Sequence, residues 1–442
     1  MKRTAILLMV SLPALPAGPL ALKDAVRIAL EKHPAIEASA ARMKAAGSRV
    51  DQAKSGRLPR VNYQESWTRS DNPVFVFSSL LAQRQFSEKD FAIGPLNRPD
   101  FLNNFQSTVT VDQVIYDGGQ TRSQIRSASL NREMTGEEDR RTRQNLIANV
   151  VRSYHGVVLA AESLEVARDA VRSADADLRR AETVRAAGMS TDADVLSIKV
   201  HLAAMREQEI RREHELEVAR AALNEALGLP LDTPHDLSTP LTLAQAPEPV
   251  AAEKSALDER PEARQLRLAA QLAETQAGAA RASYLPQVFA RAAFEADRQK
   301  FITAGGANWL FSAGLRWNLF NGFADKARIA EANQSLAAAR AQLRELSAGI
   351  ELQVRQAQSN LSSARQRIEV AQAVVTASEE SLRITKNRYD AGLATLTDLL
   401  RNETALSETR MRLLAAIYDE RLAATAVELA AGSLSASSEV LN

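Results

Sequence analysis

The sequence predicts a mainly α-helical chain that also carries membrane β-strands and is built from one unit used twice. Three observations predict this fold: a repeat offset by 204 residues, heptad rows of apolar residues, and short runs in which apolar and polar residues alternate. The repeat aligns Gly188 with Gly392, and residues 116–118 with residues 320–322. A repeat of this length indicates a duplicated module rather than a short solenoid motif.

Composition excludes several classes of function. The 442 residues contain 55 basic and 54 acidic side chains, so neither a nucleic-acid patch nor an acidic tail is indicated. There is no cysteine, which excludes disulfides, thiolate metal sites and thiol nucleophiles. His201 and His214 lack the i,i+4 spacing of a helical metal pair. We therefore expect no catalytic site, no metal, no cofactor and no nucleic-acid partner.

Residues 1–20 resemble a secretory signal peptide. Lys2 and Arg3 form a basic start, residues 4–15 are largely apolar, and small residues follow between Ala17 and Ala21. The alternative is a short anchor helix, but the apolar run is too short to span a bilayer. Cleavage would remove two positive charges and change the net charge from +1 to −1. No other apolar run suits a membrane helix, so any membrane span should be made without helices.

Two stretches without proline, residues 100–229 and 287–442, permit very long helices, because proline costs about 3 kcal/mol inside a helix. In both, a large apolar residue recurs every seven positions beside a row of small residues, which is typical of a coiled coil. The pattern predicts an outgoing helix over 120–187, roughly 100 Å long, a glycine turn and a return helix. The large rows are Val150, Val157, Leu164, Val171 and Leu178, and then Val354, Leu361, Ile368, Val375 and Leu382.

Four runs of about ten residues alternate apolar and polar side chains, near Val61, Val109, Val288 and Phe311. A period of two predicts β-strands, and this length suits tilted transmembrane strands. A soluble sandwich with tryptophan in its core is the alternative. The tryptophans fall in these runs, and we expect them at a membrane interface, where aromatic belts occur. They are Trp67, Trp309 and Trp317.

These elements divide the chain as follows. The first repeat, residues 21–228, holds a short helix, a β-hairpin with a long loop over 71–104, and a long helical hairpin with its turn near residue 188. A proline-rich linker covers 229–260, and the second repeat covers 261–432 with its turn near residue 392. The Ser- and Ala-rich tail, 433–442, should be frayed.

Four membrane strands are too few to close a barrel, because the smallest bacterial barrels have about eight and an open edge cannot face lipid. The chain must therefore oligomerise. Three copies would give a trimeric 12-stranded β-barrel continued by a long α-helical barrel of coiled-coil hairpins. Such a tube suits a conduit from the outer membrane across the periplasm.

With these features the chain resembles the TolC family of outer membrane efflux proteins over about residues 20–432. The motifs are Leu-Pro at 58–59 and 285–286, the turns at 116–119 and 320–323, the helical turns at 188–196 and 392–400, and Leu-Gly-Leu-Pro at 227–230. The resemblance implies a non-enzymatic homotrimer in the outer membrane, with a periplasmic extension that docks a periplasmic adaptor (membrane fusion protein) and an inner-membrane pump. It implies passive conduction of drugs, metal ions or polypeptides, in efflux or type I secretion, with a gate opened by adaptor docking.

The resemblance also assigns residues. It implies that both helical turns form the periplasmic tip, where the pore closes, and that Asp398 matches an acidic position lining the closed pore. The next acidic position of the family is Arg401 here, which puts a double-acid gate in doubt. Asp398 with Thr395, like Asp194 with Thr191, also fits a helix-capping box. Gly188 and Gly392 suit left-handed turns. The residues expected at strand-to-helix junctions are Gly118, Gly119 and Gly322.

Two other functions compete with a conduit. A periplasmic adaptor also contains a long helical hairpin, but should have only one, flanked by β-rich lipoyl-like segments. A coiled-coil scaffold leaves the tryptophan-bearing strands and the signal peptide unexplained. The sequence favours the conduit over both, since it has two hairpins and four amphipathic strands.

Overall fold

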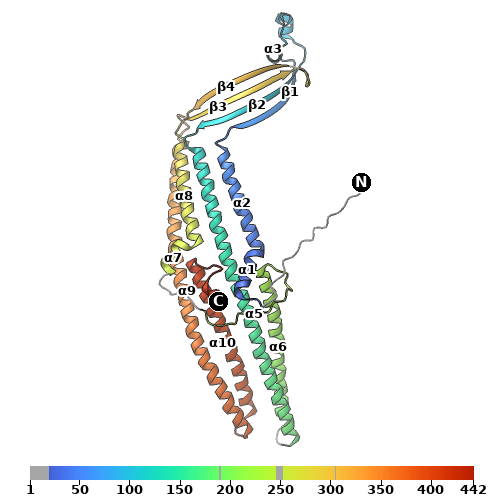
Figure 1. The fold of residues 1–442 in the computed structure, drawn as a ribbon, viewed down its shortest axis with the longest axis vertical. Helices are drawn as coiled ribbons and strands as arrows, with labels where there is room; N and C mark the ends of the chain where they lie inside the picture. Colours follow the sequence, from blue (N-terminus) through green and yellow to red (C-terminus); the bar gives the residue numbers. More distant parts are fainter. Residues whose placement is uncertain (1–18, 189–190, 245–251, 304) are drawn as a thin grey trace, which may run out of the picture. The chain divides into compact units, whose positions relative to one another are not determined.

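The computed structural model describes residues 19–188, 191–244, 252–303 and 305–442 (Figure 1). Most of the predicted signal peptide, Met189 and Ser190 of the first turn, and residues 245–251 of the linker lie outside them. The chain forms two compact units: residues up to 41, 137–264 and 345–442 in the first, and residues 42–136 and 265–344 in the second. Four helices run from one unit into the other, and each unit is described by itself.

The order of elements repeats, as the 204-residue offset predicts. The first half holds α1 (Leu22–Lys32), α2 (Pro34–Ser55), β1 (Arg60–Ser70), α3 (Pro73–Ala82), η1 (Glu88–Phe91), α4 (Ile93–Asn97), β2 (Leu102–Tyr116), α5 (Gln120–Ala186) and α6 (Asp192–Leu227). The second holds α7 (Ala252–Glu259), α8 (Pro261–Ala282), β3 (Gln287–Arg298), β4 (Gly306–Arg316), α9 (Ala324–Asp390), α10 (Leu396–Ala431) and η3 (Glu439–Leu441).

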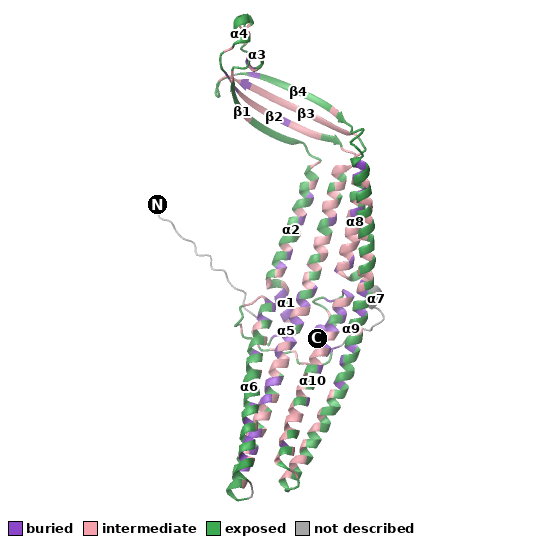
Figure 2. Cartoon of the chain, turned by 180° about the vertical axis from the view of Figure 1, so that it is seen from behind, coloured by how far each residue is buried: buried purple, intermediate pink, exposed green. Residues whose placement is uncertain are grey.

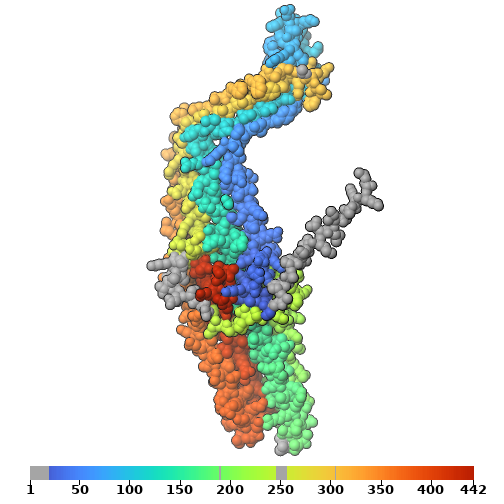
Figure 3. Space-filling view, in the orientation of Figure 1, coloured from blue at the N-terminus to red at the C-terminus, as the bar shows by residue number. Residues whose placement is uncertain are grey.

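The first unit is built on two antiparallel helical hairpins, α5 with α6 and α9 with α10, which lie side by side (Figures 1 and 3). The predicted heptad rows form their seams: Val150, Val157 and Leu164 are at most 5 % exposed, and Val354 is fully buried. The expected outgoing helix over 120–187 is α5, which has 67 residues, and α9 has the same length. In Figure 2 buried and intermediate residues run along both hairpins.

The C-terminal tail differs from the prediction. Residues 433–442 are packed rather than frayed, since Leu434, Val440 and Leu441 are at most 2 % exposed and belong to the main apolar core. The side chain of Arg421 holds the carbonyl oxygens of Val440 and Asn442. The apolar residues among the serines were too few to predict this burial.

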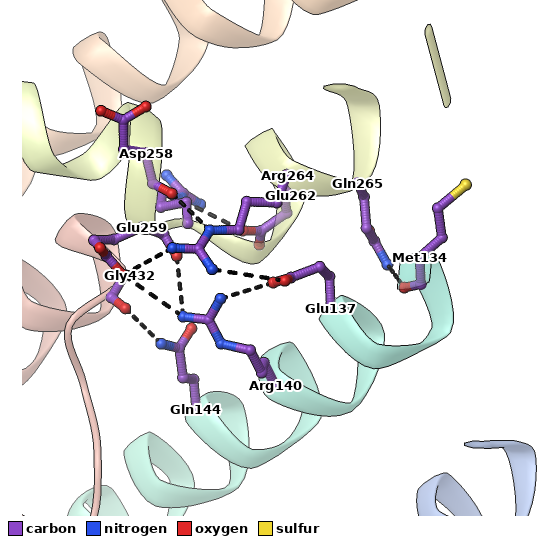
Figure 4. Close-up of polar contacts among 11 residues, drawn as sticks. Met134, Glu137, Arg140, Gln144, Asp258, Glu259, Glu262, Arg264, Gln265 and Gly432 are labelled. Carbon is purple, nitrogen blue, oxygen red and sulfur yellow. Dashed lines mark hydrogen bonds and ion pairs between the residues drawn. The ribbon is translucent and has the colours of Figure 1, made fainter. Parts of the chain in front are cut away.

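The described part of the linker, residues 229–244 and 252–260, also packs on this unit. Tyr154, fully buried on α5, donates a hydrogen bond to the Leu20 carbonyl oxygen at 2.7 Å and accepts one from the Thr239 amide at 2.9 Å. The last residues of the linker form α7, which polar contacts join to α5 (Figure 4). There Arg140 contacts both Glu137, at 2.8 Å, and the carbonyl oxygen of Glu259, at 3.2 Å.

The second unit contains a four-stranded antiparallel sheet in the order β1-β2-β3-β4, which confirms the four predicted strands. The predicted loop over 71–104 is different: it contains α3, η1 and α4, and β2 begins within it at Leu102. The apolar run 74–77 lies in α3, because Asn72 caps that helix and Pro73 occupies its first turn.

Candidate functional site at the helical turns

Both helical turns depend on a glycine. Gly188 has φ +79° and Gly392 has φ +72°, in the left-handed region that strains other residues. The Gly188 amide donates to the Arg185 carbonyl oxygen at 2.8 Å, and the Gly392 amide donates to that of Tyr389 at 3.0 Å. The left-handed turns predicted for these two glycines are therefore present.

Each return helix begins with a complete capping box. The Thr395 hydroxyl accepts from the Asp398 amide at 3.2 Å, and Asp398 Oδ2 accepts from the Thr395 amide at 3.2 Å. Thr191 and Asp194 make the same reciprocal pair at 3.1 Å in the first repeat. Hydrogen bonds from the Thr395 hydroxyl and amide hold the pKa of Asp398 below its usual value. Asp398 is therefore a helix cap that stays ionised.

Arg401 lies one turn further along α10 and is exposed. Its positive charge contributes, after the Thr395 hydrogen bonds, to lowering the pKa of Asp398. The position that is acidic in the resembled family thus carries a charge that balances Asp398.

Replacing Thr395 with alanine is expected to destabilise the first turn of α10 by about 1 kcal/mol, because the capping box is lost. Amide hydrogen exchange over residues 396–399 measures this. Thr191→Ala removes the matching cap of α6 and should speed exchange there instead. Equal exchange in wild type and Thr395→Ala would show that the box contributes nothing to α10.

Near the turns, contacts join the two hairpins to each other. Arg180 Nη2 of α5 lies 2.7 Å from Asp390 Oδ1 of α9. Leu396, at the start of α10, packs on an apolar cluster of Ala181, Val195 and Ile198. The sequence did not indicate these contacts, since a heptad pattern does not specify which helix a given face meets.

A buried charged cluster lies further along the same hairpins and contains groups from all four helices. Glu403 Oε1 of α10 accepts from the Ser173 hydroxyl of α5 at 2.9 Å, and Glu403 Oε2 lies 3.7 Å from His201 Nε2 of α6. Lys386 Nζ of α9 lies 3.9 Å from Asp177 Oδ1 of α5. The side chains of Glu403 and Asp177 are only 9 % and 8 % exposed.

Burial raises the pKa of Glu403 to about 7, helped by a hydrogen bond that protonated Glu403 donates to Asp177 and by the negative charge of Asp177, while Ser173 and Lys386 oppose this shift. Burial lowers the pKa of His201, opposed by the charge of Asp177. Glu403 therefore titrates near neutral pH at a contact between hairpins. Alignment of the repeats could have indicated this cluster. Glu182 aligns with Lys386 and Lys199 aligns with Glu403, so the two charges of the Glu182–Lys199 pair, 3.5 Å apart, exchange places in the second repeat.

The glycines expected at strand-to-helix junctions lie between β2 and α5 and between β4 and α9. Gly118, Gly119 and Gly322 all have positive φ. A Cβ on Gly118 would lie 2.9 Å from the Ala282 carbonyl oxygen, so this glycine also permits a close approach. Asp117 Oδ2 accepts from the Thr121 amide and caps the start of α5.

The register of the sheet separates a mainly apolar face from a mainly polar one, and the mainly apolar face also carries the ion pair of Arg298 with Glu65 at 2.7 Å. Val109 pairs with Tyr63 and with Phe294, and Phe294 pairs with Trp309, so all four side chains share a face. The opposite face carries chiefly polar residues, among them Gln64, Thr108, Glu295 and Asn308.

Two of the three tryptophans lie in strands, and their expected place at a membrane interface stays a prediction. Trp67 and Trp309 lie on the apolar face and are 60 % and 69 % exposed. Trp317 lies one residue past the end of β4, not within a strand, and its Nε1 donates to the Tyr284 carbonyl oxygen at 3.0 Å. This rules out the soluble sandwich with tryptophan in its core within the described single chain, since both strand tryptophans are at its surface.

No helix among the described residues is long and apolar enough to cross a membrane. The same residues contain no group of three or more His, Cys, Asp or Glu side chains arranged to hold a metal ion.

Comparisons with known proteins give matches over most of this chain. The profile described as "Outer membrane efflux protein" matches residues 25–229 and 253–433. Protein CyaE of Bordetella pertussis is 26 % identical, over 94 % of this chain and 84 % of its own. The alkaline protease secretion protein AprF of Pseudomonas aeruginosa is 25 % identical, over 94 % and 85 %. The crystal structure of CusC superposes with a TM-score of 0.79 and 18 % identity, over 93 % of this chain and 92 % of that one.

Proposed function

Because this chain belongs to the outer membrane efflux protein family, whose members are non-enzymatic transport channels, we propose that it is the outer-membrane conduit of a machine that also includes a periplasmic adaptor and an inner-membrane pump. Its substrate passes through it without covalent change. The long helical hairpins extend into the periplasm, and energy comes from the inner-membrane partner.

The observation that carries this proposal is the two-faced sheet with open edges. The outer edges of β1 and β4 pair with no strand among the described residues. An open edge in lipid leaves backbone groups without hydrogen bonds, which costs several kcal/mol for each group. Pairing of β1 with β4 of another copy removes both edges, and three copies of four strands close a twelve-stranded barrel. The apolar face then meets lipid and the polar face lines water.

The gate in this proposal is the pair of helical turns. Arg180–Asp390 and the packing of Leu396 hold the two hairpins together near the turns. An adaptor that binds the separated hairpins more tightly than the joined ones would shift the population toward the open pore. We assign docking and gating to the residues of the two turns and of the helix starts that follow them: Gly188, Thr191, Asp194, Gly392, Thr395, Asp398 and Arg401.

A polypeptide is the cargo that the relatives favour. AprF of Pseudomonas aeruginosa is named for the secretion of alkaline protease, and PrtF of Dickeya chrysanthemi, another similar protein, is named for the secretion of proteases. We propose type I secretion of a protein as the first use to examine, with small-molecule efflux as the alternative.

Single-channel conductance of the detergent-purified full chain in planar bilayers tests the conduit. We expect a small, rarely open conductance from wild type and a larger open fraction from Arg180→Ala, because the tie to Asp390 is lost. Arg179→Ala is the matched control, since Arg179 pairs with Asp175 on its own helix. If well-folded oligomers of both wild type and Arg180→Ala never conduct, the proposed conduit function is contradicted and an adaptor or scaffold is favoured.

Asp398 requires a separate comparison, because it is already a cap. If it also lines the pore, Asp398→Ala should change conductance or block by cations while Thr395→Ala does not. Equal effects of the two variants would assign Asp398 to capping alone.

A further inference from the structure

The two β-hairpins of the sheet have very different connections. Residues 71–101 join β1 to β2, whereas only residues 299–305 join β3 to β4. The longer connection, here called the insert, is folded: Phe86 makes edge-to-face contacts with Phe77 and Phe91 at 4.9 and 5.1 Å between ring centres. Asn72 Oδ1 accepts from the amides of Val74 and Phe75 and starts α3. The insert therefore has its own packing.

The insert is anchored to the polar face of the sheet. Gln83, which follows α3, donates to the side-chain oxygen of Asn104 on β2 at 2.9 Å. Asn104 donates in turn to Asp297 on β3 at 2.6 Å. The register puts Asn104 on the face of Gln106 and Thr108, and Asp297 on the face of Glu295. Gln83, Asn104 and Asp297 are at most 7 % exposed, so the insert covers this end of the polar face.

A glycine on β4 gives a second indication, separate from the Gln83 hydrogen bond, that the insert lies on the polar face. Gly306 pairs with Asp297, so a side chain at position 306 would point to the polar face. A Cβ built there would lie 1.8 Å from the Ala82 carbonyl oxygen at the end of α3. Arg84 also donates to the Ala307 carbonyl oxygen at 2.9 Å. The backbone of the insert thus lies against the polar face of β4, and only glycine admits it.

We propose that the insert is a constriction at the external mouth of the pore, where it limits the size of solutes that pass. This inference rests on the proposed function, in which the polar face lines the lumen. The insert, which lies on the polar face, then occupies the lumen. It lies at the end of the sheet opposite to the one where β2 and β4 lead into the long helices α5 and α9. In a trimer, three inserts would narrow one mouth, because only the first hairpin of each chain carries one.

The absence of cysteine makes a direct test possible. Ser312→Cys introduces a single thiol on the polar face of β4, and Ala313→Cys places the control thiol on the apolar face. Intact cells carrying the full chain would be treated from outside with a small charged maleimide or with a polymer-linked maleimide. In the Ser312→Cys background we expect fast labelling by the small reagent and slow labelling by the large one. Replacing residues 71–101 with a short Gly-Ser turn should speed the large reagent severalfold and leave the small one nearly unchanged.

Two point variants keep the test informative if that replacement does not fold. Gln83→Ala removes the polar anchor, and Gly306→Ala forces the end of α3 away from β4. Both should speed the large reagent, whereas Gly94→Ala, in the insert, should not, because a Cβ there meets nothing within 4 Å in the described part of the chain.

The outcomes separate this inference from the proposed function. The Ser312→Cys chain with an unchanged insert is compared with the same chain carrying each insert variant. If all of them react equally fast with the large reagent, the constriction is overturned and the proposed channel is not affected. A folded trimer whose Ser312→Cys thiol is no more reactive than the Ala313→Cys control, even to the small reagent, would overturn the water-filled lumen and both proposals with it.

Discussion

Replacing Arg421 with alanine should destabilise the first unit by about 3 kcal/mol or more, because several buried partners lose their donor at once. Arg421 is only 2 % exposed, and its guanidinium donates to the Thr242 carbonyl oxygen, to the Thr242 hydroxyl at 3.0 Å, and to the carbonyl oxygens of Val440 and Asn442 at 3.3 Å. It therefore joins α10 to both the linker and the C-terminal tail. A lower midpoint of thermal unfolding and faster amide exchange over residues 433–442 would measure the effect.

Arg412→Ala is the matched control on the same helix. Arg412 is 73 % exposed and contacts Glu408 at 3.2 Å, so its loss should change the midpoint little. Arg421→Lys should remain destabilised, because an ammonium group cannot reproduce the planar fork of donors. A midpoint for Arg421→Ala equal to that of Arg412→Ala would contradict the role of this residue.

Arg421 also affects a histidine. Burial, and then the charge of Arg421, lower the pKa of His155 to about 4 from an ordinary 6.5. A histidine with a depressed pKa contributes stability that is present above pH 6.5 and lost as the pH falls toward 4. Part of the acid sensitivity of this unit should therefore come from His155.

The second large effect expected is a pH dependence of the contact between hairpins at Glu403. In the folded chain the pKa of Glu403 is about 7, above its usual 4.5. The native state thus binds more protons than the unfolded state between these values, and stability falls as the pH rises. The contribution is complete below pH 4.5, declines up to about pH 7 and is lost above it, with a total of up to about 3 kcal/mol.

Glu403→Gln should remove this dependence, because a neutral amide can keep the contacts to Ser173 and Asp177 without ionising. In a conducting channel, the wild-type open fraction should rise between pH 5 and 8, the range in which Glu403 loses its proton, while that of Glu403→Gln stays nearly constant. Glu408→Gln, one turn further on the exposed side of α10, is the control and should behave like wild type. A Glu403→Gln variant with the full wild-type pH response would assign that response to another group.

The elements of the fold and the residues of the candidate site differ in how far the sequence predicts them. The duplication, the long helices and the strands depend on periodicity, which is a local property, and the described helices and strands follow it closely. The glycine turns and capping boxes were also predictable, since each is a contact within a few residues of sequence. Trp317 and the tail at 433–442 were placed wrongly because a strand end and a buried segment depend on distant partners, such as Tyr284 and Arg421.

The sequence by itself therefore determined the repeat, the type of each main element and the chemistry of the turns, because those depend on near neighbours along one chain. Only the tertiary structure decided that Glu403 meets Asp177, that Gln83 reaches Asn104, and that Gly306 must lack a side chain. These contacts join residues 21 to 226 positions apart. The free energy of such contacts comes from burial and from paired polar groups on different elements, and no local pattern specifies which elements will meet.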